Sequence, residues 1–347
     1  MAATLKQIAE ATGLSMPTIS HVLNPQSKRG HLYRQKTREL VQKVADELGY
    51  RPNMAAQSTR QGRFGSVSLV LSADPVRSMT GKGLIAGILA GLQPKDMHLN
   101  ITALPDAALT DSGYVPKILR TLMVDGLLLN YNAAIPQRMV ELIKTSHLPK
   151  IWVNSKHAVD CVYPDELGAA RKITEQLLAL GHRRIGFASY TRGSSEASWH
   201  YSGIDRYVGY AQAMEQAGLS PRLLSKEKAI PMEGQQRIAF SKQWLSDPDR
   251  PTAVICYNSD AACSVVLAAQ RMRLSLPEQL TVVSYGGQSI GQLGMVIGTM
   301  VLPEHEMGRV GAEMLLERIE NPECVSPARE LELEFNPGET VGPPRRV

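Results

Sequence analysis

The sequence predicts an all-α N-terminal domain followed by a larger, two-lobed α/β body. Three observations support this fold class: basic residues are concentrated near the N-terminus, apolar residues there recur at helical spacing, and beyond Gly62 short β-rich runs alternate with helical stretches. The 347 residues are enough for two or three domains. The expected divisions are a first domain over 1–50, a hinge and linker over 51–63 and a body over 64–347.

Charge is distributed unevenly along the chain. Residues 1–63 contain ten lysines and arginines and four acidic residues, a net charge of +6, whereas the whole chain carries +5. The remaining residues are therefore nearly neutral, with a net charge of −1. A basic domain attached to a neutral body is typical of a module that binds a polyanion such as nucleic acid, although a solubilising charged surface would have the same composition.

The first fifty residues have the pattern of three short helices. Gly13 ends the first helix, and Ser15 is a good N-cap for a second helix that tolerates Pro17 in its first turn. The apolar residues expected to face inward are Leu5, Ile8 and Ala9, then Ile19, Val22 and Leu23, then Leu40, Val41, Val44, Ala45 and Leu48. Two helices joined by a tight turn predict a helix-turn-helix, which presents the first turns of its second helix to base edges in the major groove.

The body alternates predicted strands and helices. The strands are expected at Val67–Leu71, Leu99–Leu104, Gly126–Tyr131, Lys150–Asn154, Ile185–Ser189, Ala253–Tyr257 and Thr281–Tyr285. The helices are expected at Leu84–Leu92, Val115–Met123, Gln137–Ser146, Leu167–Leu180, Tyr207–Ala217 and Ala261–Arg271. This alternation predicts doubly wound parallel sheets, which bind ligands beyond the carboxyl ends of their strands.

The chain resembles the LacI/GalR family of transcription regulators from about residue 4 to about residue 340. The resemblance is carried by the segments Thr4–Ala9, Gly13–Ser15, Thr18–Asn24 and Leu48–Asn53, and in the body by Val124–Leu129, Leu180–Ile185 and Met307–Arg309. It implies a body like that of periplasmic sugar-binding proteins, with three crossovers between the lobes. The lobes are expected to comprise about 64–160 with 292–325, and about 161–291 with 326–347.

The resemblance also implies which residues contact DNA. They are Thr4, Ser15, Met16, Pro17, Thr18, Ser20, His21, Asn24, Arg51, Asn53, Ala56, Thr59 and Arg60. Met16 and Pro17 can supply only apolar contacts, whereas Ser20 and His21 can hydrogen-bond to base edges. Thr59 stands where many relatives insert a leucine between base pairs, which predicts a weaker DNA bend. Arg34 replaces the usual capping Ser of the third helix.

By position, the resemblance implies an effector site formed by Asp74, Ser78, Asn130, Asn154, Arg206 and Asn258. Asparagine matches hydroxyl groups, and the arginine fork can bind paired oxygens. An Asn at a strand end can instead merely cap a helix, Arg206 can be a surface residue, and Asp165 can be either a ligand contact or an N-cap. Many relatives carry an Asp after the penultimate strand of the body, where this chain reads Ser284-Tyr285-Gly286-Gly287. This absence, together with Arg206, favours an anionic effector such as a sugar acid or sugar phosphate over a neutral sugar.

Other functional classes fit less well. The glycines around Gly81-Lys82-Gly83 lie too far from the preceding strand for a dinucleotide site, and helix packing explains them better. No catalytic motif, cofactor site or metal site is expected. A periplasmic solute-binding protein would need an export signal, and an architectural DNA binder would not need the body. The sequence therefore predicts a cytoplasmic bacterial repressor that binds operator DNA as a homodimer, responds to a small polar effector and has no membrane partner.

Overall fold

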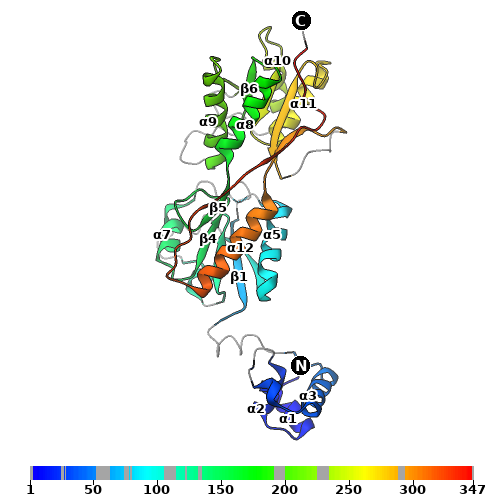
Figure 1. Ribbon diagram of the computed structural model, residues 1–347, viewed down its shortest axis with the longest axis vertical. Coiled ribbons are helices and arrows are strands. Elements are labelled where there is room, and N and C mark those ends of the chain that lie inside the picture. Colours follow the sequence, from blue (N-terminus) through cyan, green and yellow to red (C-terminus); the bar gives the residue numbers. More distant parts are fainter. Residues whose placement is uncertain are drawn as a thin grey trace. The chain divides into compact units, whose positions relative to one another are not determined.

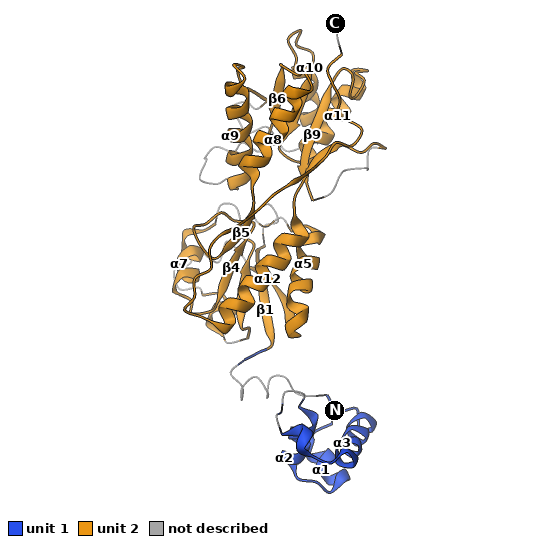
Figure 2. Ribbon diagram, viewed as in Figure 1, with its two compact units in different colours: residues 1–64 blue, residues 65–347 orange. Residues whose placement is uncertain are grey.

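The computed structural model describes residues 3–24, 27, 29–51, 63–73, 78, 80–104, 115–121, 123–131, 135–190, 200–224, 234–287 and 294–345. The chain divides into two compact units, residues 1–64 and 65–347 (Figure 2). The expected start of the body, residue 64, is within one residue of this division. The expected DNA contacts Asn53, Ala56, Thr59 and Arg60 and the expected effector contact Asp74 lie outside the described residues.

The first unit contains the three expected helices, α1 (Leu5–Thr12), α2 (Met16–Leu23) and α3 (Gln35–Glu47), with the short 3₁₀ helix η1 (Gly30–Leu32) before α3. Thr4 caps α1 in a reciprocal capping box with Gln7. Ser15 caps α2 by accepting a hydrogen bond from the backbone N–H of Thr18. The core of this unit is formed by four buried side chains, Ile8, Ile19, Val41 and Ala45.

The buried face of α3 is narrower than the sequence predicts. Val41 and Ala45, one turn apart, are fully buried, but Leu40 and Leu48 are each 44% exposed. The prediction that these two leucines face inward is wrong: of this stripe, only Val41 and Ala45 are fully buried in the core that Ile8 and Ile19 also form. Arg34 precedes α3 and makes no side-chain capping bond, as expected from the loss of Ser at this position.

The body contains two six-stranded sheets with helices on both faces (Figure 1). In the first sheet, all neighbouring strands are parallel, in the order β11-β5-β4-β3-β1-β2. These strands are β1 (Ser66–Ser72), β2 (His98–Leu104), β3 (Gly126–Leu129), β4 (Lys150–Val153), β5 (Cys161–Pro164) and β11 (Arg329–Leu331). Helices α5 (Lys82–Leu92) and α12 (Glu304–Glu320) pack against one face, and α6 (Lys117–Arg120) and α7 (Gln137–Thr145) against the other. The 3₁₀ turn η2 (Gln93–Lys95) follows α5.

The second sheet has the order β12-β10-β9-β8-β6-β7, with only β12 antiparallel to its neighbour. These strands are β6 (Ile185–Ala188), β7 (Arg222–Leu224), β8 (Ala253–Cys256), β9 (Thr281–Gly286), β10 (Gly298–Val301) and β12 (Glu334–Asn336). Helices α8 (Glu166–Ala179) and α9 (Tyr201–Gln216) contribute to the core on one face, and α10 (Gly234–Leu245) and α11 (Ser259–Arg271) to the core on the other. Nearly every strand residue facing these helices is fully buried, which explains the uninterrupted apolar runs in the sequence.

The strands that form each sheet show that the lobe limits differ from those expected. Strands β5 and β11 pair in the first sheet, although their residues fall in the ranges 161–291 and 326–347 that were expected in the second lobe. Strand β10 pairs in the second sheet, although its residues fall in the range 292–325 that was expected in the first lobe. The chain thus crosses between the sheets after β5, after β10 and between β11 and β12. The sheet that a strand joins is decided by its pairing partners, which its own sequence pattern does not reveal.

The boundaries of two predicted helices also differ. Helix α6 spans only Lys117–Arg120 of the predicted 115–123, and α9 begins at Tyr201 instead of residue 207. The remaining predicted strands and helices are present within a few residues of their expected limits. Helices α10 and α12 and the strands β5, β7, β10, β11 and β12 were not predicted.

Helices α5 and α12 lie in unusually close contact, and the glycines of α5 permit it. Gly83, Gly87 and Gly91 follow one another at four-residue spacing along one face of α5. A Cβ atom on Gly87 would lie 1.9 Å from the backbone oxygen of His305 on α12. A Cβ on Gly308 would lie 2.2 Å from the backbone oxygen of Leu84. The expectation that these glycines serve helix packing is therefore confirmed.

Replacing Gly87 by Ala is expected to force the two helices apart. Overpacking of this kind costs about 1–3 kcal/mol of the free energy of unfolding. The urea midpoint of the body, followed by circular dichroism, should fall accordingly. In the control Gly234→Ala, the nearest atom to the new Cβ is an arginine nitrogen 4.0 Å away, and no loss is expected. An unchanged midpoint for Gly87→Ala would contradict the close packing.

Candidate functional site

Helix α2 carries its expected DNA contacts on accessible positions. Ser15, Met16 and Pro17 at its N-terminus are exposed, and Met16 exposes 49% of its surface although it is apolar. The remaining expected contacts on and after α2 are half-buried: Thr18, Ser20, His21 and Asn24. The expected phosphate contacts Thr4 and Arg51 are exposed. Meanwhile Ile19 on the opposite face is fully buried, so α2 has the apolar back and accessible front that a recognition helix requires.

The loop after α2 holds the imidazole of His21. Its Nδ1 shares a hydrogen bond of 3.0 Å with the Ser27 hydroxyl. Gly30 packs against the same region, since a Cβ there would lie 2.5 Å from the backbone oxygen of His21. Ser27 and Gly30, in the loop after α2, therefore hold His21 in place.

In the first lobe, a chain of hydrogen bonds joins two of the expected effector contacts. The Ser78 hydroxyl accepts from the backbone N–H of Ser72 at 2.7 Å. Thr80 donates to the backbone oxygen of Ser78 at 3.2 Å and accepts from Nδ2 of Asn130 at 2.8 Å. Ser78 and Asn130 thus lie together, at the carboxyl ends of β1 and β3.

This position is the topological switch point of the first sheet. The chain proceeds from β1 outward to β2 on one side and to β3 on the other. In the second sheet, β6 and β8 occupy the equivalent position, and Tyr257 and Asn258 directly follow β8. Ligands of doubly wound sheets bind outside the carboxyl ends of strands at such points.

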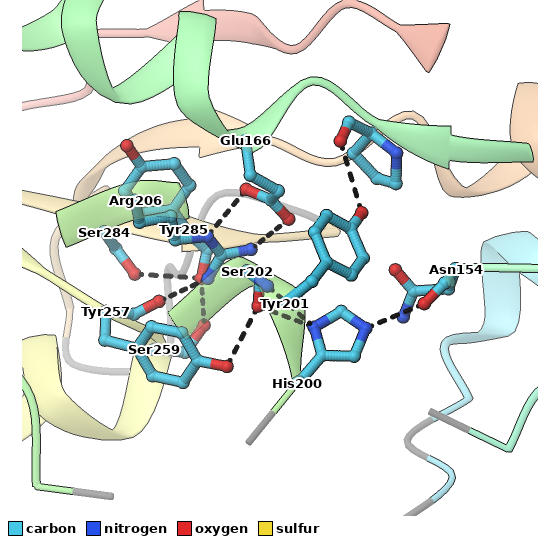
Figure 3. Close-up of polar contacts among 11 residues, drawn as sticks. Asn154, Glu166, His200, Tyr201, Ser202, Arg206, Tyr257, Ser259, Ser284 and Tyr285 are labelled. Atoms are coloured by element: carbon cyan, nitrogen blue, oxygen red, sulfur yellow. Dashed lines mark hydrogen bonds and ion pairs between the residues drawn. The ribbon is translucent and has the colours of Figure 1, made fainter. Parts of the chain in front are cut away.

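Arg206 and Glu166 form a buried ion pair in the second lobe (Figure 3). Glu166 begins α8 and is 1% exposed; Arg206, on α9, is 5% exposed. The guanidinium donates from Nε and Nη2 to the two carboxylate oxygens, at 2.6 Å each. Nη1 donates to the backbone oxygen of Tyr257 at 2.5 Å. The arginine fork expected to bind a ligand carboxylate thus holds a carboxylate of the protein itself.

Aromatic rings enclose this pair. The guanidinium carbon of Arg206 lies 5.0 Å from the ring centre of Tyr257 and 4.2 Å from that of Tyr285. Burial raises the pKa of Glu166, and Arg206 opposes that shift. Since both carboxylate oxygens accept guanidinium N–H groups, an acid proton on either would face a donor, and the geometry is that of an ionised pair.

His200 links the two lobes. It caps α9 in the second lobe, where its Nδ1 lies 2.7 Å from the Ser202 hydroxyl. Its Nε2 donates to the backbone oxygen of Asn154, which follows β4 of the first lobe, at 2.7 Å. Asn154 has a φ of 57°, a left-handed conformation that Asn tolerates. Beside this contact, Lys156 and Asp205 form an ion pair of 2.8 Å between the same segments.

A further hydrogen bond connects this link to the pair. The Ser202 hydroxyl lies 3.1 Å from the Tyr257 hydroxyl, and Tyr257 accepts from Arg206 through its backbone. The residues Asn154, Glu166, His200, Ser202, Arg206, Tyr257 and Tyr285 are hereafter called the inter-lobe cluster (Figure 3). The expected contacts Asn154 and Arg206 therefore belong to one connected group.

Two other candidates have capping roles. The Asn258 side chain accepts from the backbone N–H of Ala261 at 2.9 Å and caps α11. Asp165 accepts from Gly168 at 2.8 Å and caps α8. For both residues, the capping alternative considered from the sequence is present. Asn258 retains an amide donor beside the switch point of the second sheet. For Asp165, the structure shows the capping of α8 and no ligand contact role is needed.

Sequence reasoning missed Thr80, Glu166, His200, Ser202 and Tyr257. Glu166 could have been found as a charge directly after a strand, but β5 itself was not predicted. His200 has no local signal, because its partner Asn154 lies 46 positions earlier in the chain. Within the described residues, no group of His, Cys, Asp and Glu could hold a metal ion, and no helix is long and apolar enough to cross a membrane.

Two family models match the chain. Residues 4–53 match the model described as bacterial regulatory proteins, lacI family. Residues 174–341 match the model described as periplasmic binding protein-like domain. The first match coincides with the helical unit and the second lies within the two-lobed body.

The chain also matches known regulators over nearly their whole length. The chain is 27% identical to the ribose operon repressor of Haemophilus influenzae, over 92% of this chain and 93% of that protein. It is also 27% identical to the HTH-type transcriptional regulator GntR of Escherichia coli K12, over 97% and 98% of the two chains. The structure of the lac repressor dimer bound to operator and the anti-inducer ONPF superposes with a TM-score of 0.77, at 19% identity, over 99% of this chain and 100% of that one.

Acidification is expected to weaken the body through His200. Burial lowers the pKa of His200 to about 4, although Asn154 favours the protonated form. The unfolded chain protonates near pH 6.5. The folded state therefore binds fewer protons between these values, and its stabilisation, complete above pH 6.5, is lost as the pH falls towards 4. Through His200 alone, the free energy of unfolding should fall by about 2 kcal/mol between pH 7 and pH 5.

The measurement is the urea midpoint of the body as a function of pH. His157 and His182 also have lowered pKa values through burial, so the contribution of His200 is the difference between wild type and His200→Asn, which keeps a capping acceptor. The exposed His98→Asn serves as the control and should retain the wild-type slope. Equal slopes for all three proteins would show that His200 does not titrate as the structure implies.

Proposed function

We propose that this chain, which belongs to the LacI family of bacterial regulatory proteins, is a dimeric repressor. A small polyhydroxylated effector controls its affinity for a pseudo-palindromic operator. It is a DNA-binding transcription regulator with a ligand-binding body. The observation that carries the effector proposal is the placement of the polar residues at the switch points of both sheets. We further propose that it acts in the bacterial cytoplasm by binding alone, without catalysis.

The DNA-binding half of the proposal rests on α2. Its first turn exposes Met16 and Pro17 for apolar contacts with bases, while Ser20 and the oriented imidazole of His21 supply hydrogen bonds. The exposed Arg51 is suited to a phosphate. A single unit of this size makes few contacts, so two copies on two half-sites are needed for tight binding.

The dimer is supported by exposed apolar residues in the first lobe. Leu89 on α5 is 50% exposed, and Ile101 on the edge strand β2 is 54% exposed. An edge strand with apolar side chains is a surface that proteins normally cover. The lac repressor structure that superposes on this chain is described as a dimer on its operator.

Sugars are the effector class that the site chemistry supports. Asn130, Asn154 and Asn258 place amide groups at the strand ends, and amides match the donors and acceptors of hydroxyl groups. One of the relatives is a ribose operon repressor, so ribose is the first ligand to test. A ligand bound between the lobes would act by favouring one arrangement of the lobes over another.

Two substitutions should separate base reading from phosphate binding. His21→Ala is expected to relax base preference at one position of each half-site, worth about 1–3 kcal/mol of discrimination. Arg51→Ala should instead weaken binding to all sequences alike and reduce the salt dependence of binding by about one charge per subunit. Selection of bound sequences from a random library, with salt titration, measures both effects. An unchanged sequence profile for His21→Ala would remove His21 from the readers.

Ribose is expected to raise the melting temperature of the full-length protein. A ligand at a hundredfold excess over its Kd stabilises by about 2.7 kcal/mol, because it binds only the folded state. Asn130→Ala should lose this effect, since it removes the amide at the switch point of the first sheet. The control Asn100→Ala removes an exposed amide on the edge strand β2 and should keep it. Full stabilisation of Asn130→Ala by ribose would place the ligand elsewhere.

A further inference from the structure

Among the residues that the structure describes, Glu166 and Arg206 are the buried side chains that carry a full charge. A buried charge is costly unless it is paired, and this pair is closed by two hydrogen bonds of 2.6 Å. The pair lies beside the switch point of the second sheet, because Arg206 also donates to the backbone oxygen of Tyr257. The pair therefore adds no net charge to the place where the effector is proposed to bind.

The guanidinium of Arg206 is enclosed by other groups of the protein. One edge faces Glu166, another donor faces Tyr257, and the rings of Tyr257 and Tyr285 lie 5.0 Å and 4.2 Å from its central carbon (Figure 3). An anionic ligand would gain its largest stabilisation from a bidentate contact with a free arginine fork. In this structure the Nε–Nη2 edge that makes such a contact is occupied by Glu166.

The described groups around the pair do not supply another uncompensated cation. Lys156 is paired with Asp205 at 2.8 Å, and burial keeps the imidazole of His200 neutral near pH 7. Asp165, adjacent to Glu166, adds a negative charge. The described part of the inter-lobe cluster and its ion-paired neighbours is therefore neutral, or slightly negative once Asp165 is included.

We propose that Glu166 is a specificity-determining residue: by neutralising Arg206 inside the protein, it tunes the effector site to uncharged polyhydroxylated ligands and against anionic ones such as sugar phosphates. The inference rests on the proposed effector site. It reverses the preference for an anion that the sequence suggested, because that preference treated Arg206 as an unpaired cation. Discrimination arises because an anion entering the site loses its hydration without gaining a free cation.

The test compares ribose with ribose 5-phosphate, which has the same stereochemistry at its ring carbons but carries a phosphate on O5. Full-length wild type, Glu166→Gln and Asp165→Asn are titrated by calorimetry at constant ionic strength. Asp165→Asn is the matched control, because it also removes one negative charge but leaves Arg206 paired and retains a capping side chain. Wild type and Asp165→Asn are expected to prefer ribose. Glu166→Gln should shift the ratio of the two affinities towards ribose 5-phosphate by about tenfold or more.

Either of two results would overturn the inference: a wild-type preference for ribose 5-phosphate, or the same affinity ratio in Glu166→Gln and Asp165→Asn. The wild-type comparison can overturn the inference even if Glu166→Gln does not fold. If wild type binds neither sugar, the choice of ribose fails, but the inference is still tested with inorganic phosphate. Phosphate should then raise the melting temperature of Glu166→Gln more than that of wild type and Asp165→Asn. Phosphate binding by the DNA-binding unit contributes equally in all three proteins. Equal rises in all three proteins would overturn it.

Discussion

The ion pair between Glu166 and Arg206 organises the edge of the second lobe. Removing one partner of such a pair leaves an unpaired buried charge, at a cost of about 3–5 kcal/mol. The pair joins the first residue of α8 to the middle of α9, and through the backbone of Tyr257 it also holds the segment after β8. The orientation of the helices on this face and the polarity of the adjacent site thus depend on the same two side chains.

Parallel sheet geometry explains why the polar residues meet at all. The carboxyl ends of parallel strands lie at one edge of a sheet. In both sheets of the body the chain leaves two neighbouring central strands towards opposite sides, which creates a topological switch point. Asn130 lies at this edge in the first lobe and Tyr257 in the second. His200 then connects the lobes by one short hydrogen bond to the backbone of Asn154. A change in lobe arrangement must break or move this contact, which makes it a natural place for a ligand to exert control.

Much of the fold was predictable because its signals are local. Ile8, Ile19 and Val41 recur at helical spacing and form the core of the first unit. The long buried strands, such as β1 and β9, are continuous apolar runs bounded by turn residues. The glycines of α5 were also interpreted correctly, since glycine at four-residue spacing on a helix allows another backbone to approach. The residues of β5, β10 and β11 were assigned to the wrong lobe, because the sheet that a strand joins is decided by its pairing partners and not by its own pattern.

The sequence by itself determined the helix-turn-helix unit, the alternating body and the positions of Asn130, Asn154 and Arg206 within it. The first two features follow from residue periodicity and capping residues, which act over a few positions of the chain. The three site positions follow from the family resemblance. Only the tertiary structure decided what Arg206 binds, because Glu166 lies 40 positions away on another helix. The charge of the effector site belongs to that second kind of information: a charged residue has no fixed electrostatic effect until its partner and its burial are known.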